Sequence, residues 1–170
     1  MSYRTYIAAS RAAYVAGIEA GIAPQELRAH TGVMGEAFVA DYLGVKLTPE
    51  NNQRGFDLVD KNGLRVSVKT ITTSTGAGLN ENTIDLVDRV IVVWIDTHED
   101  ELDLTVVYDK SVEAFLADAA APYRGVLRLG KGVMTFPQRA QTASKFEVGE
   151  VEDTFEDGDV VIRKHTTGSF

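Results

Sequence analysis

Three charged residues in the first half of the chain, Glu36, Asp57 and Lys69, have the side chains that metal-dependent phosphodiester hydrolysis requires. An aspartate and a glutamate beside a lysine can hold Mg²⁺, because this hard cation binds one or two carboxylates together with waters and substrate phosphate. The metal would activate a water molecule and stabilise the pentavalent phosphate, and the lysine would orient that water or neutralise charge. The fold has to bring these three separated residues together.

The glutamate lies in a predicted helix at Val33 to Leu43, which is apolar on most sides and is therefore expected to be largely buried. Thr31 is the expected N-cap, and Gly44 ends the helix. At helical spacing Glu36 shares a face with apolar residues. A carboxylate in such a place needs a polar partner, which a metal ion or the lysine would supply.

The aspartate and the lysine lie on two predicted strands, at Phe56 to Asp60 and at Leu64 to Ile71. The segment between the strands contains Asn62-Gly63, and Asn-Gly between alternating runs is the strongest short signal for a β-hairpin. The lysine and the serine two residues before it share one face of the second strand. An antiparallel register would let the aspartate approach that face from the neighbouring strand.

The block from Gly35 to Thr70 resembles the PD-(D/E)XK nuclease superfamily, the restriction-endonuclease-like proteins. That family combines a glutamate on a helix, an aspartate at the start of a strand, and acid-x-Lys on the next strand of a hairpin, and Glu36, Asp57 and Lys69 occupy these places. The resemblance implies hydrolysis of DNA, less readily of RNA, with Mg²⁺ or Mn²⁺ as cofactor. It implies that Asp57 and Glu36 hold the metal and that Lys69 assists the attacking water. A homodimer is a further implication, since many nucleases of this fold are dimeric.

One position departs from the family pattern, because Ser67 stands where the acid of acid-x-Lys is expected. A neutral hydroxyl is a poor Mg²⁺ ligand compared with a carboxylate. In one alternative Glu36 completes the metal site, and Ser67 is a spacer or contacts the metal through a water molecule. In the other, the chain is a catalytically inactive binding or regulatory module of a defence system or a phage. The candidate substrate-binding residues are Ser67 itself and Gln53 and Arg54, just before the aspartate, which would contact substrate phosphate or water.

The other elements are predicted from apolar periodicity and turn residues. The predicted helices are at Tyr3 to Ile22 and at Lys110 to Ala120, the latter with Val112, Phe115 and Leu116 facing inward, and a short helical piece is expected at Gln25 to His30. Strands are expected at Val45 to Leu47, Arg89 to Ile95, Leu102 to Tyr108, Val126 to Leu129 and Val133 to Phe136. A loop is expected at Thr72 to Asn82, followed by a helical turn near Ile84 to Val87. Together they predict an α/β fold in which helices flank a mixed central sheet. Residues 1–146 would form this restriction-endonuclease-like domain. The acidic residues 147–170 would form a C-terminal hairpin or tail that could dock a protein partner.

Charge restricts how the protein could bind nucleic acid. The 170 residues carry a formal net charge of -8, whereas proteins that grip nucleic acid through many phosphates usually have a basic excess. Much of the acidity follows Phe146, and the block from Gly35 to Thr70 is neutral, with five basic and five acidic side chains. This distribution of charge therefore allows a local phosphodiester-binding site but disfavours tight DNA binding without a metal.

Several other classes are excluded. The chain has no cysteine and its three histidines are widely spaced, so no zinc site is expected, and it has no P-loop. No apolar run approaches the ~20 residues that a membrane helix needs, and the first residues do not resemble a signal peptide. These features predict a soluble cytoplasmic protein without a membrane partner. A small-molecule-binding protein with the Thr72 to Asn82 loop as a lid is a third, weaker alternative.

Overall fold

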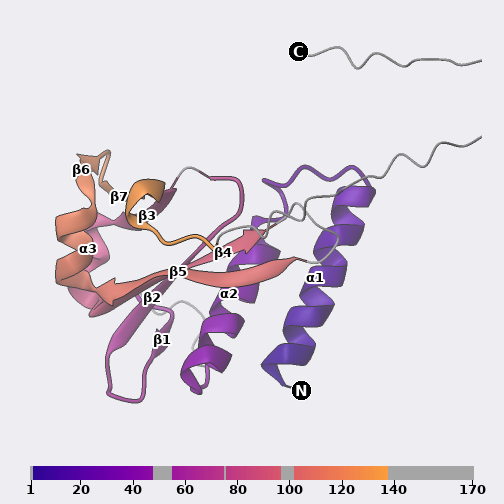
Figure 1. The fold of residues 1–170 in the computed structure, drawn as a ribbon, viewed down its shortest axis with the longest axis horizontal. Coiled ribbons are helices and arrows are strands. Elements are labelled where there is room, and N and C mark those ends of the chain that lie inside the picture. Colours follow the sequence, from indigo (N-terminus) through magenta and orange to yellow (C-terminus); the bar gives the residue numbers. More distant parts are fainter. Residues whose placement is uncertain (1, 48–54, 75, 97–101, 138–170) are drawn as a thin grey trace, which may run out of the picture. The chain divides into compact units, whose positions relative to one another are not determined.

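The computed structural model describes residues 2–47, 55–74, 76–96 and 102–137, which form a mixed α/β fold (Figure 1). The substrate-binding candidates Gln53 and Arg54 and the predicted C-terminal hairpin or tail lie outside the described residues. In chain order the elements are α1 (Tyr3–Glu19), α2 (Arg28–Leu43), β1 (Leu58–Val59), β2 (Arg65–Ile71), β3 (Gly76–Asn80), the 3-10 helix η1 (Glu81–Leu86), β4 (Arg89–Asp96), β5 (Asp103–Ser111), α3 (Val112–Asp118), β6 (Ala120–Tyr123), β7 (Val126–Gly130) and the 3-10 helix η2 (Lys131–Val133).

The main sheet has four strands in the order β1-β2-β4-β5, with β2 and β4 parallel and the other neighbours antiparallel. The prediction of a mixed sheet is therefore confirmed. Strand β4 is central because its β-branched run can be buried on both faces, and Val90, Ile91, Val92 and Val93 are all 0 % exposed.

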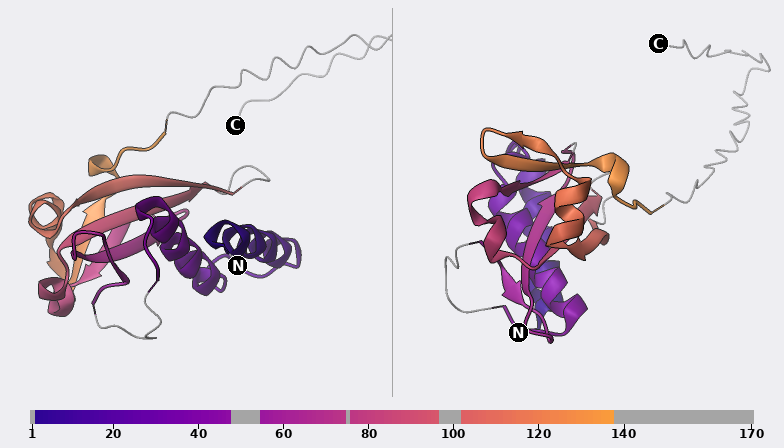
Figure 2. Two further views of the ribbon diagram at one scale, coloured as in Figure 1. Left: turned by 90° about the horizontal axis from the view of Figure 1, so that it is seen from below. Right: turned by 90° about the vertical axis from the view of Figure 1, so that its left-hand side faces the viewer.

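Helices cover the two faces of this sheet. Ile91 and Val93 of β4 pack in one cluster with Val39 of α2, while Val90 and Val92 pack in another cluster with the fully buried Phe115 of α3. Figure 2 shows α1 and α2 side by side on the same side of the sheet. The predicted flanking helices are thus confirmed, and α2 is the helix that lies against β2.

A second sheet, which the sequence analysis did not predict, has three antiparallel strands in the order β3-β7-β6. The predicted loop at Thr72 to Asn82 is wrong in this part, because Gly76–Asn80 is strand β3. The two glycines of β3 lie close to β7: a Cβ atom at Gly76 would overlap the carbonyl oxygen of Leu129, and one at Gly78 would lie 2.9 Å from Val126 Cγ1. Pairing with a distant strand thus overrides the low β-propensity of a Gly-Ala-Gly segment.

Other boundaries also differ from the predictions. Helix α2 begins at Arg28, so Thr31 is not its N-cap but lies inside it and donates its hydroxyl to the carbonyl of Arg28 at 3.1 Å. Leu116 of α3 is 47 % exposed and does not face inward. The short strands expected at Val45 to Leu47 and Val133 to Phe136 are not strands. The helical turn expected near Ile84 to Val87 is confirmed as η1.

The predicted hairpin is confirmed, with Leu58 opposite Val66. Asp60 Oδ1 stabilises its turn by accepting hydrogen bonds from the backbone N–H groups of Asn62 at 2.8 Å and Leu64 at 3.0 Å. The start of β2 is joined to the start of β4 by Arg65, whose guanidinium and backbone N–H both donate to Asp88 at 2.8 Å. These bonds fix the register in which the strands present their side chains.

Gly35 sets the distance between α2 and β2. A Cβ atom at this position would overlap the hydroxyl of Thr70 and would lie 3.1 Å from its Cβ, so rotation of the threonine would not remove the crowding. The absence of a side chain lets the helix pack closely on the strand. The next residue, Glu36, is thereby brought near the side chains of β2.

Replacing this glycine should destabilise the fold, whereas replacing a glycine one turn earlier should not. We expect Gly35→Ala to lower the free energy of unfolding by about 1–3 kcal/mol through overpacking. Gly32→Ala is the matched control, because a Cβ there meets nothing within 4 Å and alanine favours a helix by about 0.5–1 kcal/mol. Urea unfolding of both variants measures the difference, and changes of the same sign would contradict the close contact.

The Arg65–Asp88 pair should make stability depend on pH in the acid range. The hydrogen bonds from Arg65 lower the pKa of Asp88 from its ordinary 3.8 to about 2. A carboxyl group with a lowered pKa stabilises the fold above its unfolded pKa and loses that contribution as the pH falls through its folded pKa. We expect wild type to lose more stability than Asp88→Asn between about pH 5 and pH 2 in urea unfolding. Equal losses would show that Asp88 does not contribute.

Candidate functional site

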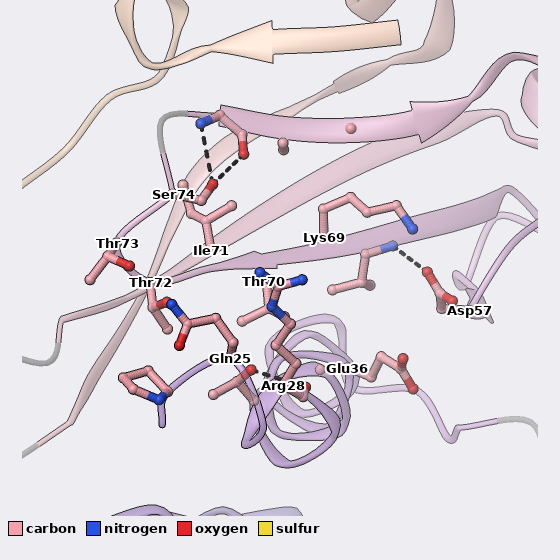
Figure 3. Close-up of a pocket in the computed structure, with 17 residues that line it drawn as sticks. Gln25, Arg28, Glu36, Asp57, Lys69, Thr70, Ile71, Thr72, Thr73 and Ser74 are labelled. Atoms are coloured by element: carbon pink, nitrogen blue, oxygen red, sulfur yellow. Dashed lines mark hydrogen bonds between the residues drawn. The ribbon is translucent and has the colours of Figure 1, made fainter. Parts of the chain in front are cut away.

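A pocket of about 570 Å³ opens between α2, β2 and the start of β3 (Figure 3). Glu36, Asp57 and Lys69 all line it, so the structure brings these three predicted site residues together. Each of them is half-buried, which allows contact with both the protein and a ligand. Figure 3 shows the three side chains at one end of the pocket, and Gln25, Arg28 and Thr72 toward the other.

The acidic end lies at the edge of β2, just before strand β1 begins at Leu58. The backbone N–H of Asp57 donates to Val66 at 2.9 Å, and the Asp57 carboxylate then accepts the N–H of Val68 at 2.6 Å. The side chain thus takes the hydrogen bond that a further residue of β1 would otherwise make. Only Oδ2 makes these bonds, so among the described residues Oδ1 remains available to a ligand.

Glu36 and Lys69 reach this end from opposite faces of the main sheet. Lys69 pairs in register with Val92, which packs toward α3, whereas Glu36 projects from α2 on the other face. Figure 3 shows Lys69 on one side of the β2 ribbon and α2 on the other. The ammonium group of Lys69 and the carboxylate of Glu36 are both directed toward Asp57. No salt bridge within 4.0 Å joins Lys69 to either carboxylate in the part of the chain that the structure describes.

Electrostatics show that the three charges interact. Partial burial raises the pKa of Glu36 above its ordinary value, the negative charge of Asp57 raises it further, and the positive charge of Lys69 opposes both effects. Like charges held close in a pocket favour a cation between them. The arrangement is therefore one in which a bound cation would relieve repulsion between two carboxylates.

Ser67 has a different place from the one that the family pattern assigns to the acid. It is 2 % exposed and is not part of the pocket lining. Its hydroxyl lies 3.4 Å from Asp57 Oδ2, a long hydrogen bond that helps to orient the aspartate. The structure thus gives Ser67 contact with a site residue but no direct contact with the pocket, where it had been predicted to bind substrate.

The metal-ligating side chains at this end of the pocket are the two carboxylates of Glu36 and Asp57. Within the described ranges no group of three or more His, Cys, Asp or Glu side chains could hold a metal, so the usual ligand set for structural zinc is missing there. Mg²⁺ needs fewer protein ligands, because it keeps several waters and takes one or two carboxylates. Val68, whose N–H donates to Asp57, also lines the pocket beside the two carboxylates.

The residues at the other end of the pocket were not predicted as site residues. Gln25 and Arg28 fell in a predicted short helical piece, and Thr72 in a predicted loop. A signal for Arg28 was present, because Arg28, Gly32 and Glu36 follow one another at four-residue spacing and therefore lie on one helix face. Finding it required that α2 be extended back to Arg28.

Comparison of the chain with known protein families and with curated proteins found no match to either. Among the described helices, none combines the length and the apolar character that crossing a membrane requires.

The interaction between the three charges can be tested through the pKa of Glu36. We expect Asp57→Asn to lower this pKa, because it removes a negative neighbour, and Lys69→Met to raise it, because it removes the opposing positive charge. NMR titration of the side-chain carboxyl carbons measures both shifts. Asp41→Asn is the control, since Asp41 lies on α2 but pairs with Arg4 outside the pocket. An unchanged Glu36 titration in both site variants would show that the charges are too far apart to share a metal.

Proposed function

We propose that this chain is a nuclease of the PD-(D/E)XK type, which hydrolyses phosphodiester bonds of DNA with Mg²⁺ or Mn²⁺ as cofactor. The main support is that Glu36 of α2, Asp57 just before β1 and Lys69 of β2 line the same end of one pocket. They are also the three residues through which the chain resembles that superfamily. The repulsion between Asp57 and Glu36 supports a cation site at this end without reference to the resemblance.

Each residue has a role that its place in the fold supports. Asp57 and Glu36 would hold the metal, which when bound activates water and polarises the phosphate. The bond from Val68 keeps the Asp57 carboxylate in one orientation, so no reorganisation is needed when substrate binds. Lys69 approaches from the other face of the sheet, where its ammonium group can orient the attacking water or neutralise charge on the phosphate.

A second candidate function is a non-catalytic binding or regulatory module that has kept the nuclease fold. Ser67 favours it, because a buried hydroxyl replaces the acid that would otherwise complete the metal site. The net charge of -8 also favours it over a protein that binds DNA strongly. The two candidates differ in whether the pocket binds a divalent cation and cleaves DNA.

A cleavage assay separates the two candidates. We expect wild type to cut plasmid and oligonucleotide DNA in Mg²⁺ or Mn²⁺, and Asp57→Asn or Lys69→Ala to lower the rate by about 100-fold or more, as for other groups that stabilise a transition state. Calorimetric titration with Mn²⁺ should show one site that Asp57→Asn removes and the control Asp41→Asn keeps. Wild-type protein that neither binds the cation nor cuts DNA would overturn the nuclease proposal and support the module.

A further inference from the structure

The pocket is longer than a single metal-bound phosphodiester requires. Its volume of about 570 Å³ lies within the range of about 300–1,000 Å³ that holds whole ligands. Glu36 and Arg28 are eight residues apart on α2, which corresponds to about 12 Å at the rise of an α-helix. The two ends of the pocket can therefore contact different groups of one ligand.

The end near Arg28 has the opposite chemical character to the metal-binding end. It is lined by Arg28, Gln25, Thr72 and Thr73, whereas both acidic residues of the lining are at the other end. Figure 3 shows the Arg28 side chain extending from α2 toward Thr70 of β2, with the Gln25 amide directed toward Thr72. One positive charge, an amide and two hydroxyls thus converge from two sides of the pocket.

Arg28 differs from the arginines that have structural roles in this fold. Arg4, Arg65 and Arg89 each form a salt bridge with aspartate. Within the described residues no such bridge involves Arg11, Arg28, Arg124 or Arg128, and of these four only Arg28 lines this pocket. A guanidinium group presents a planar set of donors that matches the oxygens of a phosphate.

We propose that the Arg28 end of the pocket binds a second phosphate group of the DNA strand, next to the phosphodiester held at the metal-binding end. This inference rests on the proposed function for the identity of the ligand. Arg28 is the charged contact, and Gln25, Thr72 and Thr73 supply uncharged hydrogen bonds. The subsite adds affinity through the backbone of the strand and carries no base specificity. It also lets a protein of net negative charge hold DNA at a local positive site.

Binding to a fluorescein-labelled single strand of about 12 nucleotides, without terminal phosphates, tests this subsite. Fluorescence anisotropy is measured in Ca²⁺, which replaces Mg²⁺ to prevent cleavage, at several NaCl concentrations. We expect Arg28→Gln to weaken binding by about tenfold and to lower the slope of log K against log [salt] by about 0.7, the value for one phosphate contact on a single strand. Arg4→Gln is the matched control, because it removes an arginine outside the pocket and should leave the slope unchanged.

The outcomes separate this inference from the proposed function. An Arg28→Gln protein with wild-type affinity and slope, or a wild type that does not bind the strand, would overturn the subsite. Cleavage by wild type that Arg28→Gln leaves unchanged, together with an unchanged slope, would overturn the subsite and keep the nuclease. Binding that depends on Arg28 without cleavage in Mg²⁺ or Mn²⁺ would keep the subsite and overturn hydrolysis.

Calorimetric titration with inorganic phosphate tests whether the ligand of this subsite is a nucleic-acid backbone or a free phosphate ion. We expect inorganic phosphate to bind far more weakly than the strand. Binding as tight as that of the strand would assign the pocket to a free phosphate and overturn the proposal. Circular dichroism and thermal unfolding of Arg28→Gln check the fold, and little change is expected because Arg28 is exposed.

Discussion

The hydrogen bond from the N–H of Val68 to the carboxylate of Asp57 is the interaction on which the site depends. Strand β1 pairs with β2 over only two residues, so the edge of β2 beyond Val66 needs another acceptor. A side-chain carboxylate supplies it at 2.6 Å and ends the pairing. The bond that completes the strand edge also fixes a charged group at the mouth of the pocket. One hydrogen bond thus both completes the edge of β2 and orients the Asp57 carboxylate. The edge of β2 next to Asp57 remains open for a ligand.

The position of Glu36 has a comparable origin in core packing. Close approach of α2 to β2 at Gly35 places the next side chain over the open strand edge, while Val39 and Ala40 of the same helix bury the sheet below. The carboxylate is therefore held at a half-buried place by the hydrophobic core rather than by a partner of its own. Its raised pKa shows that this placement has a free-energy cost. Such costs are common where a residue serves binding rather than stability.

The parts of the fold that the sequence predicts are those with strong local signals. The run of β-branched residues in β4, the turn around Asn62-Gly63 and the apolar helix α2 are recognisable from short stretches of chain. Helix α2 carries Glu36, and the two arms of the hairpin around this turn carry Asp57 and Lys69, so the acidic end of the pocket could be predicted.

Strand β3 could not be predicted, because its Gly-Ala-Gly sequence becomes a strand only by pairing with β7. The first residues of α2 lack a capping side chain, which hid Arg28 and the second end of the pocket.

The three-stranded sheet has a consequence for the order in which the site is assembled. Gly76 and Gly78 of β3 form part of the pocket wall, and their pairing partners lie about fifty residues later in β7. Closing so long a loop has an entropic cost before any contact can repay it, and non-local pairing slows folding. The hairpin and its charged residues can form early from neighbouring segments. The wall facing them is completed only after the chain has extended through Gly130, so a nascent protein would hold its charged residues before it has an enclosed pocket.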